Sequence, residues 1–260
     1  MKKITIISAL MCLTFLGFSQ MAKEYKLSPK GDVSQTTIVI ENLYADVIIE
    51  GTSGSEISIE TDDYEGIPEK AKGLKPLSAT GPENTGIGLS VQQEGNLIKI
   101  SGASKKADGE YYFKVPKNIK LKVDLNSWQG GDFSATGLSN EVEVKTQNGD
   151  LDLKNITGPL VAYSLSGDIE VDFSTISQAT PTSITTTSGD VDVTLPASTK
   201  GNFKLSSISG EIYTDMDFQF GNDEKMKRLG GGMSSEATLN GGGVEITLKS
   251  ISGDVYIRKK

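Results

Sequence analysis

The sequence of 260 residues has no histidine and a single cysteine, Cys12. One thiol cannot form an internal disulfide, and a chain without histidine lacks the commonest zinc ligand and the commonest general base. Hydrolases built on a histidine-activated serine or cysteine are therefore excluded. The chain has 26 lysines and arginines against 34 aspartates and glutamates, a formal net charge of −8, so no nucleic-acid partner is expected.

Long apolar runs are also missing, except at the start of the chain. Two lysines precede an apolar run over residues 4–18, which is shorter than the ~20 residues that span a bilayer. The small residues Gly17 and Ser19 favour cleavage ahead of Gln20. These features predict a secretory signal peptide over residues 1–19 and an exported protein that is periplasmic, cell-surface or secreted. No membrane span is expected after signal cleavage.

One phrase is present in five copies: Ser or Thr, any residue, Ser or Asn, Gly, and an acid, followed by alternating apolar residues. The copies are Thr146–Asp150, Ser164–Asp168, Thr186–Asp190, Ser207–Glu211 and Ser250–Asp254. A turn that recurs with fixed flanks indicates one structural unit used many times. The acids follow Asp132 at steps of 18 to 22 residues, and a final step of 43 residues predicts one hidden copy of the unit within residues 218–235.

Apolar residues alternate with polar ones after each glycine, as in half-buried strands. If each unit is one coil of two or three short strands, equivalent residues stack in columns ~4.8 Å apart. We therefore predict an all-β fold, a right-handed parallel β-helix (β-solenoid) of short strands with Gly-Asp corners, and a β-sandwich is the fallback. A single domain over residues 20–260 is expected, with insertions at about 61–86 and 218–235.

The chain also resembles a known family. The run from Tyr111 to Leu125, the serial Asn/Ser-Gly-Asp turns and the ending from Ala237 to Ile257 are similar to bacterial putative-adhesin domains of unknown function, relatives of head-domain auto-transporter adhesins. This resemblance covers most of the chain after residue 19. It implies a right-handed β-solenoid from an envelope or secreted protein, with no catalytic residues to carry over.

The corner residues have structural explanations. Glycine adopts a positive φ without a Cβ clash, and the flanking Ser, Asn and Asp side chains can bond to nearby backbone N–H groups. The Ser/Thr column is expected to form a hydroxyl ladder between coils.

The aspartates Asp150, Asp168 and Asp190 would stack with Glu211 about 5 Å apart, where each like-charged pair repels by roughly 1 kcal/mol in water. Two explanations stay open: solvation with hydrogen bonds from turn amides, or a bound calcium ion. Four more acids alternate onto the same outer face and could add calcium ligands: Asp152, Glu170, Asp172 and Asp192. The Gly-Gly-x-Gly-x-Asp pattern of calcium-binding β-rolls is absent. No other cofactor is expected.

The aromatic residues Trp128 and Tyr163 are candidates for ligand contact, because aromatic planes suit the apolar faces of sugar rings. Phe133, Tyr213 and Tyr256 could belong to the same sugar-binding face. Trp128 lies where the first corner departs from the repeat. The alternative is that these side chains pack within the coils.

The leading functional hypothesis is a non-catalytic exported module that binds an envelope or extracellular protein or glycan. The alternatives are an envelope-stress signalling component and a polysaccharide-acting β-helix enzyme with paired carboxylates such as Asp168 and Asp190. The missing histidine and the regularity of the acids argue against an enzyme. The strands before Glu60 and the charges of residues 258–260 are expected to guard the solenoid ends, so a monomer is predicted.

Overall fold

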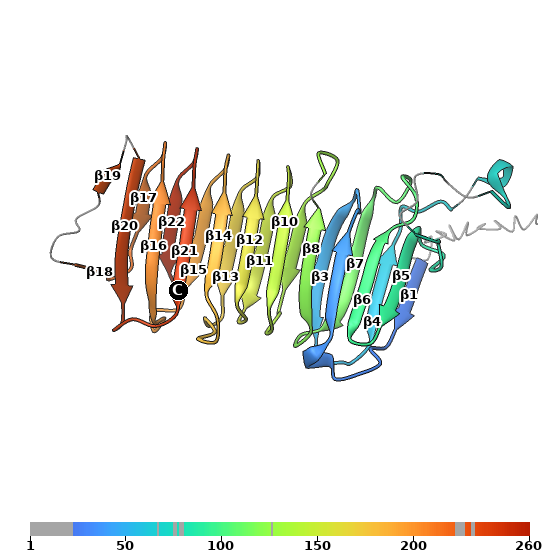
Figure 1. The fold of residues 1–260 in the computed structure, drawn as a ribbon, viewed down its shortest axis with the longest axis horizontal. Coiled ribbons are helices and arrows are strands. Elements are labelled where there is room, and N and C mark those ends of the chain that lie inside the picture. Colours follow the sequence, from blue (N-terminus) through green and yellow to red (C-terminus); the bar gives the residue numbers. More distant parts are fainter. Residues whose placement is uncertain are drawn as a thin grey trace, which may run out of the picture.

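Two long sheets face each other, with their strands running across the long axis of the molecule (Figure 1). The computed structural model describes residues 23–260 apart from 67, 75–76, 78–80, 126, 222–226 and 230–231. The signal peptide predicted over residues 1–19 lies outside the described residues.

The first sheet has ten strands. In spatial order they are β1 (Lys23–Leu27), β4 (Ile57–Thr61), β7 (Glu110–Pro116), β3 (Asp46–Thr52), β9 (Phe133–Thr136), β11 (Leu151–Ile156), β13 (Ile169–Phe173), β15 (Val191–Leu195), β22 (Val255–Lys259) and β17 (Ile212–Thr214).

The second sheet has twelve strands. In spatial order they are β18 (Gln219–Phe220), β20 (Gly232–Leu239), β16 (Gly201–Ser207), β21 (Glu245–Ser250), β14 (Thr182–Thr186), β12 (Leu160–Ser164), β10 (Val142–Thr146), β8 (Lys120–Leu125), β2 (Thr37–Glu41), β6 (Leu97–Gly102) and β5 (Leu89–Glu94), with β19 (Lys227–Leu229) beside β20. The described residues add two 3-10 turns, η1 (Val33–Gln35) and η2 (Glu69–Ala71), and no helix able to cross a bilayer.

From β8 to β15 the chain alternates between the two sheets, so that each pair of consecutive strands forms one coil. Neighbouring coils pair in parallel and in register: Val142 of β10 lies opposite Leu160 of β12, and Thr146 lies opposite Ser164. The same pattern relates β11 to β13 and β13 to β15. The predicted β-solenoid is confirmed.

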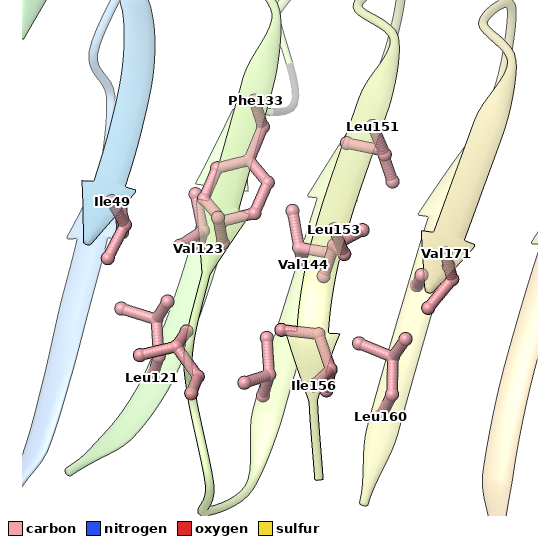
Figure 2. Packing of buried hydrophobic residues seen from close by; sticks show 14 of the residues in the cluster. Ile49, Leu121, Val123, Phe133, Val144, Leu151, Leu153, Ile156, Leu160 and Val171 are labelled. Atoms are coloured by element: carbon pink, nitrogen blue, oxygen red, sulfur yellow. The ribbon is translucent and has the colours of Figure 1, made fainter. Parts of the chain in front are cut away.

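The core lies between the two sheets and runs along the whole stack. Alternate residues of each strand point inward, as period-two patterning requires. Figure 2 shows Val123 and Val144 from the twelve-stranded sheet in the same space as Phe133, Leu151 and Leu153 from the ten-stranded sheet, and all of them are buried. Burying each such side chain stabilises the fold by about 1.5–3 kcal/mol, so the stacked coils are held together largely by this continuous core.

The order of coils in space differs from their order in sequence at both ends of the stack. The coil β2–β3 lies between β6–β7 and β8–β9, and the coil β21–β22 lies between β14–β15 and β16–β17. In Figure 1 the blue β3 accordingly lies among green strands, and the red β21 and β22 lie among orange ones. The hidden copy predicted within residues 218–235 is wrong, because the strands described there, β18, β19 and β20, pair only antiparallel.

The ends of the stack are closed by antiparallel strands. At one end β4 pairs antiparallel with β1 and β7, and β5 pairs antiparallel with β6. The prediction that the strands before Glu60 cap this end is correct for β1 and β4 alone, since β2 and β3 belong to an internal coil. The expectation that residues 258–260 guard the other end is wrong, because β22 lies between β15 and β17.

Candidate binding surface

A ladder of aspartates runs along the outside of one corner of the solenoid. The backbone N–H of Asp168 donates to Oδ1 of Asp150 at 2.8 Å, and that of Asp190 donates to Oδ1 of Asp168 at 2.8 Å. Beyond Asp190 the ladder continues to Asp254 and only then to Glu211. The expectation that Glu211 stacks directly on Asp190 is wrong, because the inserted coil β21–β22 separates the two residues. Each rung joins two coils through a charge-assisted hydrogen bond.

A second ladder runs inside the same corner. The buried hydroxyl of Thr186 donates to the carbonyl oxygen of Gly167 at 2.9 Å, and the buried hydroxyl of Ser250 donates to that of Gly189 at 2.8 Å. The expected hydroxyl ladder therefore exists, with the glycine carbonyls of the adjacent coil as acceptors. The corner is closed on both sides by hydrogen bonds between coils.

The corner glycines serve a different purpose from the one predicted. The residues with positive φ do not include Gly149, Gly167 or Gly189. A Cβ at Gly167 would instead collide with the carbonyl oxygen of Gly149, and a Cβ at Gly189 with that of Gly167. Glycine is required because adjacent coils approach closely at the corner, and the positive-φ explanation is wrong.

The ladder engages one carboxylate oxygen of each aspartate proposed to bind calcium: Asp150, Asp168 and Asp190. Among the described residues, no group of three or more acidic side chains is arranged to hold a metal ion. Three of the neighbouring acids form ion pairs: Asp152 with Lys154, Asp172 with Lys260 and Asp192 with Arg258. Calcium binding stays a prediction, which a higher melting temperature in calcium than in chelator would support.

Trp128 marks an interruption of the corner. The connection from the end of β8 to Asp132 is three residues longer than the equivalent connection from the end of β10 to Asp150. A turn closed by the Gly130 N–H and the Ser127 carbonyl oxygen holds the loop, and Asn148 Nδ2 donates to the Trp128 carbonyl oxygen at 3.0 Å. Trp128 is 72% exposed, so the alternative that it packs within a coil is wrong.

A hollow of about 330 Å³ lies beside this loop. Its lining is mostly polar, and one side of it carries two acidic residues in neighbouring strands, Glu41 and Asp124. The lining residues are Glu41, Asn42, Leu43, Tyr44, Asp124, Leu125 and Ser127. Ser127, the residue before Trp128, lines the hollow, so the loop that carries Trp128 borders a concave polar surface.

The other aromatic candidates are separated. Tyr163 lies on the outer face of the twelve-stranded sheet, between Lys145 and Thr185. The coil β10–β11 separates the coil of Tyr163 from that of Trp128, so the two do not form one site. Phe133 is 1% exposed and belongs to the core, and its expected place on a sugar-binding face is wrong.

Two of the aromatic candidates do meet. Tyr213 of β17 and Tyr256 of β22 are paired across strands and stack with ring centroids 5.3 Å apart and planes at 12°. Arg258 lies 5.3 Å from the Tyr256 ring and forms a bidentate pair with Asp192. Tyr213 and Tyr256 lie side by side because the last coil is inserted next to β17, which makes β17 and β22 neighbouring strands.

The model of the Toastrack DUF4097 family matches residues 103–258. The chain belongs to this family. The family resemblance seen in the sequence is thereby confirmed. A comparison with curated proteins finds no match to the chain.

Two solved structures are similar to this Toastrack protein. One is a putative cell adhesion protein from Clostridium sporogenes ATCC 15579, with 12% identity over 92% of this chain and 100% of that chain and a TM-score of 0.44. The other is a putative adhesin from Bacteroides fragilis NCTC 9343, with 12% identity over 93% of this chain and 98% of that chain and a TM-score of 0.40.

The family match begins directly after β6 and ends within β22. The Toastrack region therefore includes the aspartate ladder, Trp128 and the Tyr213–Tyr256 pair. The coil β2–β3 lies outside the matched residues, although it is inserted into the same stack and its Asp46 accepts the Asp132 N–H at 2.9 Å.

Proposed function

We propose that this Toastrack protein is an exported, non-catalytic module that binds an extracellular or envelope protein or glycan, as an adhesin does. The observation that carries the proposal is the highly exposed Trp128 side chain, which is held on a hydrogen-bonded loop beside a polar hollow. Partly apolar, partly polar aromatic side chains are enriched in binding sites because they bury a large area on contact.

Hydrogen bonds hold the backbone of residues 127–130. The Ser127–Gly130 turn and the Asn148 contact connect the loop to its own coil and to the next. A side chain presented on a fixed backbone loses less conformational freedom on binding, which improves affinity. This arrangement suits recognition.

The arrangement of the corner aspartates supports a structural role for their carboxylates. Asp168 and Asp190, the pair considered for glycoside hydrolysis, are consecutive members of the ladder, where Asp168 accepts the Asp190 N–H. The same arrangement recurs at Asp150 and Asp254. A pair that repeats from coil to coil is explained by the architecture, so we propose no reaction at these residues. Absence of cleavage products across a polysaccharide panel is the expected result.

Trp128 provides its own test, because it is the only tryptophan of the chain. We expect its fluorescence to shift when the purified protein is titrated with a ligand found on arrays of surface glycans and extracellular proteins. Trp128→Ala should weaken binding to that array ligand at least tenfold. Tyr112→Ala, an exposed aromatic change on β7, is the matched control and should leave binding unchanged, because the coil β2–β3 separates β6–β7 from the coil of Trp128. Equal binding by wild type and Trp128→Ala would contradict the proposed site, and no binder on either array would contradict the function.

Export is tested separately. We propose that the chain is secreted after cleavage ahead of Gln20. N-terminal sequencing of protein recovered outside the inner membrane should begin at that residue, and recovery of the uncleaved chain from the cytoplasm alone would contradict export.

A further inference from the structure

We propose that Tyr213, Tyr256 and Arg258 form a second binding site at the end of the ten-stranded sheet where β17 lies. This site would take a neutral pyranose ring of a glycan. The inference rests on the proposed binding function and specifies a ligand class for a surface distant in sequence from Trp128.

The tyrosine pair presents an aromatic face at the end of a sheet. The strand β17 is the last of the ten-stranded sheet in the described part of the chain, at that end of the stack in Figure 1. One face of the Tyr213 ring stacks on Tyr256, and Tyr213 is 51% exposed. Among the described residues, no strand of this sheet lies beyond β17 to cover the opposite ring face. A flat apolar ring face of a ligand can continue the stack there.

The inner ring of the pair is held in place. The Tyr256 hydroxyl donates to Asp254 Oδ2 at 3.0 Å, and this hydrogen bond raises the pKa of the Tyr256 phenol. The Arg258 guanidinium also lies 5.3 Å from the Tyr256 ring centroid. Tyr256 therefore supports Tyr213 as a rigid platform, which favours binding because little side-chain freedom is left to lose.

Polar groups surround the aromatic face. A hollow of about 290 Å³ is lined by Tyr213, Thr214, Asp215, Tyr256, Ile257 and Arg258. Arg258 uses Nε and Nη2 on Asp192, which leaves Nη1 as a donor, and Asp215 uses Oδ1 to accept the Lys259 N–H, which leaves Oδ2 as an acceptor. A donor and an acceptor beside an aromatic plane match a ring with one apolar face and hydroxyls around its edge.

The charges of the site select a neutral ligand. Asp192 neutralises Arg258, and Lys259 pairs with Asp217. Asp215 and Asp254 add negative charge beside the two rings. An anionic sugar would meet a net negative surface, and like charges repel. The geometry thus points to a neutral hexose or pentose polymer.

The test is affinity electrophoresis of the purified protein in native gels that contain one soluble polysaccharide each. We expect retardation by at least one neutral polymer among hydroxyethyl cellulose, galactomannan, xylan and glucan, and none by alginate. Tyr213→Ala should lower the affinity at least tenfold, whereas Tyr213→Phe should stay within threefold because the aromatic plane remains. Tyr112→Ala on the opposite end of the same sheet is the matched control, and circular dichroism melting verifies that each variant folds.

The outcomes separate this site from the proposed function. Equal retardation of wild type and Tyr213→Ala, with loss in Trp128→Ala, would overturn the tyrosine site and leave the proposed function standing. Retardation by alginate alone, or binding of array proteins without any neutral polymer, would overturn the ligand class. Absence of any binder in both the arrays and the gels would overturn the proposed function itself.

Discussion

The backbone N–H of Asp190 donates a 2.8 Å hydrogen bond to Oδ1 of Asp168, which lies 22 residues earlier in the chain. The N–H of Asp168 in turn donates to Asp150. Each corner aspartate is thus a donor to one neighbouring coil and an acceptor from the other, and the ladder joins successive coils of the stack.

Removal of one rung should destabilise the fold modestly. We expect Asp168→Ala to lower the free energy of unfolding by about 1 kcal/mol, because the Asp190 N–H loses a charged acceptor at a solvent-accessible corner. Asp168→Asn keeps an oxygen at the position and should lose less. Glu170→Ala, an exposed change on the same coil, is the control for charge removal. Urea unfolding measures all three, and equal losses for Asp168→Ala and Glu170→Ala would contradict a specific role for the rung.

Substitution of a corner glycine should cost more than removal of an aspartate. In Gly167→Ala the new Cβ would collide with the Gly149 carbonyl oxygen, so the two coils must separate. Such overpacking costs roughly 1–3 kcal/mol. Gly54→Ala is the matched control, because its Cβ would meet only Thr52 Oγ1 at 3.6 Å. Thermal unfolding that fails to distinguish the two variants would show that the corner tolerates a Cβ.

Deletion of the last coil should be far more damaging than deletion of an end strand. Residues 245–260 form β21 and β22, which pair with coils on both sides. Their buried apolar side chains are Ile246, Leu248, Val255 and Ile257. Each contributes about 1.5–3 kcal/mol of burial, against a typical total stability of about 5–15 kcal/mol.

The truncated chain should therefore lose its cooperative unfolding transition, measured by circular dichroism. Addition of a peptide of residues 244–260 should restore the transition by filling the same position. Deletion of residues 23–27, the edge strand β1, is the control and should leave a cooperative transition. A truncated chain that unfolds like the wild type would contradict the interleaved arrangement.

Alkaline pH should destabilise the protein through Tyr111. This side chain is buried and donates to the Ile87 carbonyl oxygen at 2.7 Å, and burial raises the pKa of its phenol. Below pH of about 10 the phenol is neutral in both states and its contribution is complete. Above that pH the unfolded chain ionises first, so stability falls as pH rises toward the folded-state pKa.

Tyr111→Phe separates the two effects. It should cost about 1 kcal/mol at neutral pH, because the Ile87 carbonyl oxygen loses its donor, and it should flatten the decline in stability between pH 9 and 11. Parallel pH profiles for wild type and Tyr111→Phe, measured by urea unfolding, would contradict this assignment.

The local pattern of the sequence predicts much of the fold. Leu151 and Leu153 alternate with polar residues after a Gly-Asp turn, and that alternation is enough to predict a strand with one buried side. The repeated turn predicts that such strands stack in register, as the pairing of Val142 with Leu160 confirms. These features follow from period two and regular spacing, which are properties of neighbouring residues.

The candidate sites were less accessible to such reasoning. Trp128 could be singled out because it interrupts the repeat, but its exposure could not be predicted. Glu211 was expected beside Asp190, whereas Asp254 lies there. The stacking of Tyr213 on Tyr256 depends on a strand order that no local pattern contains.

By itself the sequence determined the coil, its corner and its inward columns, because side-chain alternation and turn composition are encoded within each unit of about twenty residues. Only the tertiary structure decided the order in which coils stack, since every coil presents similar edges and apolar columns to its neighbours. That order positions β22 beside both β15 and β17. The glycine requirement, the continuity of the aspartate ladder and the tyrosine site all arise from contacts between coils rather than within them.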